Sequence, residues 1–291
     1  MGAESDFFVP IARDLPASET PPEQIHVSES GFCELYLLRR DGRCRVCKVL
    51  KPEYRGNPVH ESLLRKEFDL GFGLDHPGIC RTLDWTRLPG FGSAILMEWV
   101  DGRTLDVWAA QEKPGPDRIR QVFSEICDAL DYIHRRQLVH RDIKPENVML
   151  THDGDHVKLI DFGLADADAW YLYKQPAGTR DYAAPEVLAG RAADARSDIF
   201  SVGVMLGEFG GRRFSRQAAK CMKQLPDRRY RSAGQLRHAL TRRTGRRCMV
   251  IVPVILAAFV AFWLLWNFRR SERHAARIFH EATELIESAF R

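Results

Sequence analysis

Two short motifs of the chain carry side chains whose types and spacing suit phosphoryl transfer. The segment His140–Asn147 contains Asp142, Lys144 and Asn147, and Asp161 opens an Asp-Phe-Gly motif downstream. A transferred phosphoryl group needs metal ions, a group that orients the attacking hydroxyl, and nearby positive charge. Asp142 can orient a hydroxyl and accept its proton, whereas Asn147 and Asp161 offer the hard oxygen ligands that magnesium prefers. One motif alone would also fit a polar hairpin, but two in this order, the second preceded by a strand-like run, argue against that alternative.

These motifs resemble the catalytic loop and the metal-binding loop of eukaryotic-like serine/threonine protein kinases. The resemblance covers most of the chain, about residues 25–243. It implies an α+β, two-lobed fold, with a small antiparallel β-sheet and one helix over about 25–99 and a mainly helical lobe over about 103–243. It also implies ATP and Mg²⁺ as cofactors and a protein Ser/Thr hydroxyl as substrate. The residues it assigns to catalysis are Asp142, Lys144, Asn147 and Thr179, and those it assigns to the metal are Asn147 and Asp161.

The same resemblance assigns a nucleotide site to the first lobe and the hinge. Lys48 would hold the nucleotide's α- and β-phosphates and pair with Glu67, with Glu61 as the second candidate for that pairing. Met97 would be the gatekeeper, and the backbone of Glu98 and Val100 the edge that hydrogen-bonds adenine. The complete set of nucleotide contacts it implies is Val27, Leu35, Val46, Lys48, Glu67, Met97, Glu98, Val100 and Met149.

Further motifs imply structural roles in the second lobe. Residues 178–186 resemble the end of a serine/threonine kinase activation segment, in which Thr179 would hydrogen-bond near Asp142 and Lys144. Glu186 would form a buried ion pair with Arg231. Asp198 would anchor the backbone of the catalytic loop.

The chain departs from the family's pattern in the loop that covers the phosphates. Ser28, Ser30 and Cys33 stand where the family has three glycines. Glycine lets a backbone approach phosphates closely and bend freely, so we expect weaker or slower nucleotide binding. The alternative function is a pseudokinase-like membrane scaffold that binds nucleotide weakly.

Regulation and partner binding differ from the pattern too. No Ser or Thr lies between Asp161 and Gly178, so we expect activity that does not depend on phosphorylation of that segment. The short interval between Glu208 and Ala218 predicts a shortened second lobe. Gly71 stands where the family stacks a large apolar residue on Phe162, a position that Leu70 or Leu74 could fill instead.

Composition bounds the broad class of protein. The chain has 291 residues, 45% of them hydrophobic, so it can bury a sizeable core. Its formal net charge of +4 is mild, and no basic stripe with interleaved aromatics is present, which argues against a nucleic-acid partner. The seven cysteines show no disulfide framework, which suits a reducing compartment. Cys44 and Cys47 would point to opposite faces of a strand, so a metal or redox pair is not expected there.

Local patterns predict the following elements. We expect a β-hairpin of strands 34–40 and 43–50, a helix over 61–74, strands over 82–86 and 94–99, and a long amphipathic helix over 117–136. Further helices are expected over 197–208 and from residues 216 and 232.

The two ends of the chain differ from the middle. Residues 1–24 are rich in proline and polar residues and are expected to be an irregular leader without a signal peptide. Residues 249–266 are uncharged, and at ~1.5 Å per residue they span roughly 27 Å, close to a ~30 Å hydrocarbon core. We therefore expect a transmembrane helix over 249–268 and a short amphipathic tail over 269–291. Arginines flank both ends of this span, so their distribution does not decide its orientation. Because the kinase-like domain needs ATP, we expect it on the cytoplasmic side. The expected location is a bacterial inner membrane, with a single span and self-association through the span or tail.

Overall fold

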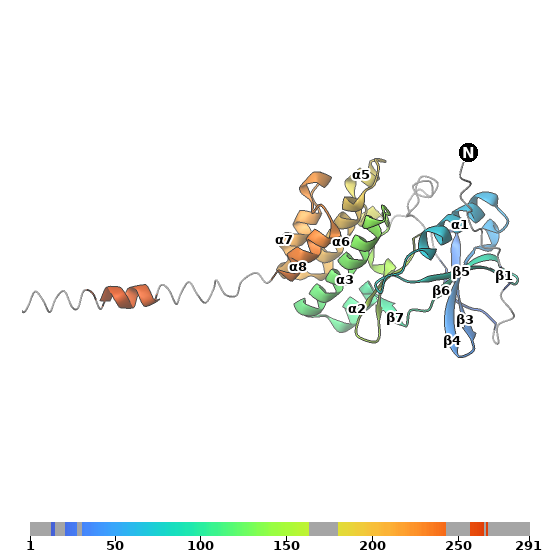
Figure 1. Cartoon of the computed structure of the whole chain (residues 1–291), viewed down its shortest axis with the longest axis horizontal. Coiled ribbons are helices and arrows are strands. Elements are labelled where there is room, and N and C mark those ends of the chain that lie inside the picture. The colour runs from blue at the N-terminus through green and yellow to red at the C-terminus, as the bar shows by residue number, and fades with distance from the viewer. Residues whose placement is uncertain are drawn as a thin grey trace, which may run out of the picture. The chain divides into compact units, whose positions relative to one another are not determined.

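The computed structural model describes residues 13–14, 21–27, 31–162, 180–242, 257–264 and 266. It has the expected two-lobed, α+β architecture (Figure 1). The first lobe is built on a six-stranded sheet in the order β1-β5-β6-β4-β3-β2, in which only the β1–β5 pair is parallel. The bounds of its elements are β1 Arg13–Asp14, β2 Glu23–Val27, β3 Cys33–Arg40, β4 Arg43–Leu50, α1 Pro58–Phe72, β5 Thr82–Leu88 and β6 Gly92–Glu98.

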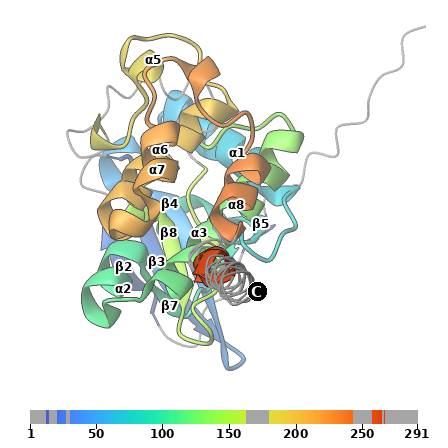
Figure 2. The same cartoon turned by 90° about the vertical axis from the view of Figure 1, so that its left-hand side faces the viewer.

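The second lobe is mainly helical (Figures 1 and 2) and also contains the small three-stranded sheet β7-β8-β9, whose strand β8 directly follows the 3₁₀ turn Pro145–Asn147. Its elements are β7 Gly102–Thr104, α2 Leu105–Glu112, α3 Pro116–Arg135, β8 Val148–Thr151, β9 Val157–Leu159, α5 Pro185–Leu188, α6 Ala195–Phe209, α7 Gly211–Cys221 and α8 Ala233–Thr241. Short 3₁₀ turns cover Pro52–Tyr54, Pro145–Asn147 and Pro226–Arg228.

Alternation along β3 and β4 divides the first lobe into two apolar layers. Cys33 and Leu50 join Leu64, Phe68, Trp85 and Ile95 in a cluster between the sheet and α1. Tyr36, Leu38, Cys47 and Val49 pack with Leu88 and Ala94 on the opposite face. Because side chains alternate between the two faces of a strand, Lys48 shares the α1 face with Leu50. Cys44 and Cys47 point to opposite faces, as expected, and both are free thiols.

Helix α3 is the central support of the second lobe. The apolar positions that predicted it, at three- and four-residue spacing, are all buried: Ile119, Val122, Phe123, Ile126, Ala129, Leu130 and Ile133. They belong to one cluster that also contains Phe162 and buried residues of α6, α7 and α8. The long helix therefore ends directly beneath the residues that lead into the catalytic loop.

Several expected boundaries were wrong. Helix α1 begins at Pro58 rather than residue 61, because Asn57 caps it by accepting a hydrogen bond from Val59 N at 3.0 Å. Helix α7 begins at Gly211 rather than residue 216, and a single residue separates it from α6. The left-handed backbone of Gly211, with φ of 60°, allows this sharp turn. Two residues of the expected leader, Arg13–Asp14, pair with β5.

The predicted membrane span lies largely outside the described residues. Residues 257–264 and 266 are helical, and their large apolar side chains are exposed: Phe259, Val260, Phe262, Trp263, Leu264 and Trp266. Within the described residues, no helix has both the length and the apolar character needed to cross a bilayer.

Gly71 allows α1 to pack closely against β5. A Cβ atom at this position would lie 2.5 Å from Thr82 Oγ1. Of the two residues proposed to fill its place beside Phe162, Leu74 is buried in the same cluster as Phe162, whereas Leu70 is only half-buried. Of the two candidates, Leu74 is thus the one that shares an apolar core with Phe162.

We predict that Gly71→Ala lowers the free energy of unfolding by about 1–3 kcal/mol, because overpacking outweighs the gain in helix propensity. In a Thr82→Ala background the clash is removed, so the same substitution should be neutral or stabilising. Thermal unfolding midpoints of the four proteins check both signs. Gly73→Ala is the matched control, since a Cβ there would meet nothing within 4 Å; equal midpoints for Gly71→Ala and Gly73→Ala would contradict the packing argument.

Candidate active site

Asp142 lies in a fixed orientation on the catalytic loop between α3 and β8. Lys144 Nζ lies 2.9 Å from Asp142 Oδ2, and Asn147 Nδ2 donates to both Oδ2 and the main-chain oxygen of Asp142 at 2.8 Å. Oδ1 of Asp142 is buried and has no hydrogen-bond partner among the described residues. The carboxylate is therefore held through one oxygen, while the other is left to accept a proton.

Asp161 is brought to the same place by the strand that precedes it. Ile160 N donates to Asn147 O at 3.0 Å. Because Asp161 directly follows Ile160, this bond brings the two predicted metal ligands, Asn147 and Asp161, close together. Asp161 itself has a left-handed backbone, with φ of 65°, which turns the chain away from β9. No group of three or more His, Cys, Asp or Glu side chains in the described parts of the chain could hold a metal ion. A magnesium ion on Asn147 and Asp161 would thus need oxygens from phosphates or water as well.

Lys48 is buried between two carboxylates. Its Nζ lies 2.6 Å from Glu67 Oε1 and 2.8 Å from Asp161 Oδ1. Glu67, and not the alternative Glu61, is therefore the partner on α1. Burial alone would lower the pKa of Lys48, but the carboxylates of Asp161 and Glu67 outweigh it and raise that pKa well above its usual range. Burial raises the pKa of Glu67 to about 7, against the opposing effect of Lys48.

The predicted adenine contacts lie mostly on one face of the sheet. In the strand register Leu35 lies opposite Lys48, and Val46 lies opposite Met97. Since directly opposed residues of antiparallel strands share a face, these four residues lie on the side that carries Lys48. Val27 lies opposite Glu34, so the register does not group it with them.

Two further predicted contacts lie at the hinge and in the second lobe. Glu98 N donates to Arg81 O at 3.0 Å, so its N–H is already engaged, and the Glu98 carbonyl accepts from Cys80 Sγ at 3.8 Å. The Glu98 carboxylate accepts from Lys158 Nζ at 2.6 Å and so ties β6 to β9. Val100 is buried. Met149 is half-buried between Val148 and Leu150, which point into the core of the second lobe.

Comparison with known proteins agrees with this geometry. Residues 27–239 match the protein kinase domain family. The chain belongs to this family. Relatives of this kinase domain include a protein of Streptomyces coelicolor named a probable serine/threonine-protein kinase, 36% identical over 197 residues, which cover 62% of this chain. PknB of Mycolicibacterium smegmatis, a serine/threonine-protein kinase, is 34% identical over 189 residues, which cover 61% of this chain.

The matched regions are 28% and 30% of the lengths of those two relatives, so the chain spans less than a third of either. Among solved structures, the kinase domain of Mycobacterium tuberculosis PknI superposes with a TM-score of 0.59 at 25% identity. That superposition covers 75% of this chain and 93% of the PknI chain.

Asp198 anchors the catalytic loop of the kinase domain, as predicted. It accepts from His140 N at 2.9 Å and from Arg141 N at 2.8 Å. His134 Nε2, at 2.8 Å, is a third partner that the sequence did not reveal, because a histidine in the last turn of a helix reads as an ordinary end residue. Burial alone would raise the pKa of Asp198, but the hydrogen bond and charge of His134, with smaller effects from His140, lower it below its ordinary value.

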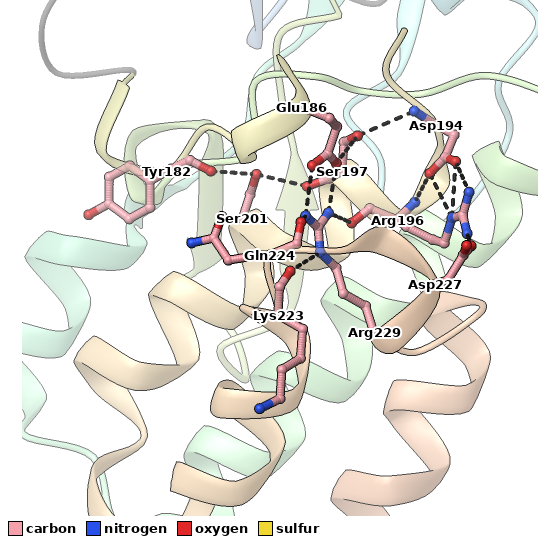
Figure 3. A network of polar contacts seen from close by, with 10 residues as sticks. All are labelled: Tyr182, Glu186, Asp194, Arg196, Ser197, Ser201, Lys223, Gln224, Asp227 and Arg229. Carbon is pink, nitrogen blue, oxygen red and sulfur yellow. Dashed lines mark hydrogen bonds and ion pairs between the residues drawn. The ribbon is translucent and has the colours of Figure 1, made fainter. Parts of the chain in front are cut away.

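The ion pair of Glu186 forms with Arg229, so the predicted partner Arg231 was wrong (Figure 3). Arg229 Nη1 and Nη2 lie 2.7 Å from Glu186 Oε1 and Oε2, respectively, and Ser197 Oγ donates to Glu186 Oε1 at 2.9 Å. Arg229 also donates to the main-chain oxygens of Lys223, Gln224 and Arg196. The 3₁₀ turn Pro226–Arg228 directs Arg229 into the lobe, whereas Arg231 is exposed.

The remaining site predictions fall at the edges of the described chain. Thr179, Ser28 and Ser30 lie outside the described residues. Cys33, at the third glycine position, is buried in the cluster between α1 and the sheet, so its side chain fills the core of the lobe. Burial raises the pKa of its thiol far above the usual range.

We predict that Arg229→Gln lowers the free energy of unfolding by about 3–5 kcal/mol, because Glu186 would remain as a buried, unpaired charge. Arg231→Gln, two residues away and exposed, is the matched control and should change it by less than about 0.5 kcal/mol. Urea unfolding of both variants measures the difference. If the two variants were equally stable, the assignment of Arg229 would be contradicted.

Proposed function

We propose that the chain is an ATP-dependent serine/threonine protein kinase that transfers the ATP γ-phosphate to protein hydroxyls. The observation that carries the proposal is the Asp142 carboxylate, fixed by Lys144 and Asn147 through one oxygen and buried with the other oxygen unbonded among the described residues. A base within reach of a hydroxyl and a nearby ammonium are what this transfer requires. The names of the relatives support the choice of serine/threonine over other substrates.

Each described residue has a defined role in this proposal. Asp142 Oδ1 orients the attacking hydroxyl and accepts its proton, while Lys144 places positive charge beside it. Lys48, held by Glu67, binds the α- and β-phosphates. Asn147 and Asp161 would hold magnesium, which neutralises the charge that develops on the phosphates. Their amide and carboxylate oxygens suit that ion, and a site with two protein ligands leaves room for phosphate oxygens.

We predict that Asp142→Asn lowers phosphate transfer from radiolabelled ATP by about 10²–10⁴-fold, the usual contribution of a general base. Mg²⁺-dependent ATP binding, measured by calorimetry, should be unchanged because Asn147, Asp161 and Lys48 remain. Glu146→Gln is the control, since that neighbouring carboxylate is exposed.

The second candidate function is a pseudokinase scaffold, which the loop without glycines suggests. Absence of Mg²⁺-dependent ATP binding by the unaltered protein would favour it.

We further propose that residues 249–268 form a single transmembrane helix, followed by an amphipathic tail over 269–291, with the kinase domain on the cytoplasmic side of a bacterial inner membrane. The uncharged run of residues 249–266 supports this, as do the helical backbone and exposed apolar side chains of its described part. Self-association through the span or tail is part of the same proposal. So is a shortened second lobe without the family's docking helix, which the one-residue connection of α6 to α7 supports.

We predict that the full chain stays with the membrane fraction after carbonate extraction, while a chain ending at Arg242 is released. A released full chain would contradict the span. Gel filtration of the full chain in detergent should then show a dimer, and monomer alone would contradict self-association.

A further inference from the structure

The root of the phosphate-covering loop, at Phe32, is attached to the segment that leads into α1. Lys51 N donates to Phe32 O at 2.8 Å. The Phe32 ring meets the His60 ring edge-to-face, with centroids 5.7 Å apart. Tyr54 stacks on the same His60 ring, with centroids 4.3 Å apart and an interplanar angle of 26°. Three rings therefore join the entry to β3, at Phe32, to the first turn of α1.

The same segment also contacts Glu34, near the start of β3. Arg55 Nη2 lies 3.5 Å from the buried Glu34 carboxylate, and Arg55 Nε donates to Leu50 O at 2.9 Å. Tyr36 OH donates to Glu34 at 2.9 Å. Residues between positions 51 and 60 therefore contact both Phe32 and Glu34. These contacts couple the start of β3 to this segment.

Helix α1 links this segment to Lys48. His60 lies in the first turn of α1, which Asn57 caps, and Glu67 lies two turns further along the same helix. Glu67 is bonded to Lys48, the phosphate-binding residue of the proposed function. The start of β3 and the carboxylate that orients Lys48 are therefore connected through α1.

We propose that His60 is a positioning residue for ATP: its ring, between Phe32 and Tyr54, holds the start of β3, which leads to the predicted nucleotide contact Leu35, at a fixed place relative to α1 and the Lys48–Glu67 pair. The inference rests on the proposed function, because it concerns the same nucleotide site. A strand start that is held in place before the nucleotide arrives spares the cost of ordering it on binding.

We predict that His60→Ala in the full chain raises KM for ATP by about three- to tenfold, the factor that one aromatic pair represents. The value of kcat should stay within about twofold, because Asp142 and its partners lie in the other lobe. His60→Phe retains a ring and should restore KM. Val59→Ala, an exposed neighbour in the same turn, is the control. An unchanged KM in His60→Ala, or no recovery in His60→Phe, would overturn the proposal.

Hydrogen exchange without nucleotide separates this inference from the proposed function. Amides of residues 31–34 should exchange faster in His60→Ala than in the unaltered chain or His60→Phe. Equal exchange in all three would overturn the attachment even if the chain proved to be an active kinase. If the chain transferred no phosphate, faster exchange would still establish the attachment and only the proposed function would fail.

Discussion

The position of Lys48 between Glu67 and Asp161 is the interaction on which the active site depends. A buried ammonium is costly unless it is paired and hydrogen-bonded, and here the two partners come from different parts of the fold. Glu67 comes from α1 and Asp161 from the turn after β9, while Lys48 lies on β4. The charge therefore fixes a helix and a loop of the second lobe against the sheet. Its raised pKa keeps it a cation throughout the physiological range.

In the second lobe the buried charges are carboxylates, and each accepts hydrogen bonds from several donors. Asp198 collects two backbone N–H groups of the catalytic loop and His134, and so sets the path of the chain into Asp142. Glu186 receives Arg229 and Ser197. Asp198 thereby supplies partners that polar backbone groups of the catalytic loop need. Glu186 instead links α5 to α6 and to Arg229.

Sequence reasoning succeeded where a pattern is local and periodic, or where motif order limits the choices. The apolar spacing of α3 predicted its buried face, and the order of motifs predicted the Lys48–Glu67 pair and the contact of Asp198 with the backbone of the catalytic loop. It failed where a turn decides direction. Arg229 and Arg231 are equivalent as residues, and only the 3₁₀ turn before Arg229 sends it inward. It also failed at contacts between distant segments, such as His134 with Asp198 and His60 with Phe32, because neither histidine belongs to a recurring motif.

The close approach of α1 to β5 at Gly71 restricts how this sequence can change over generations. A large apolar residue at position 71, as in the family's common pattern, would collide with Thr82, which lies 11 positions away on another element. A smaller residue at position 82 would have to arise first. Substitutions at positions 71 and 82 are thus contingent on one another. Lineages that share this packing should keep a small residue at 71 wherever position 82 has a side chain as large as threonine.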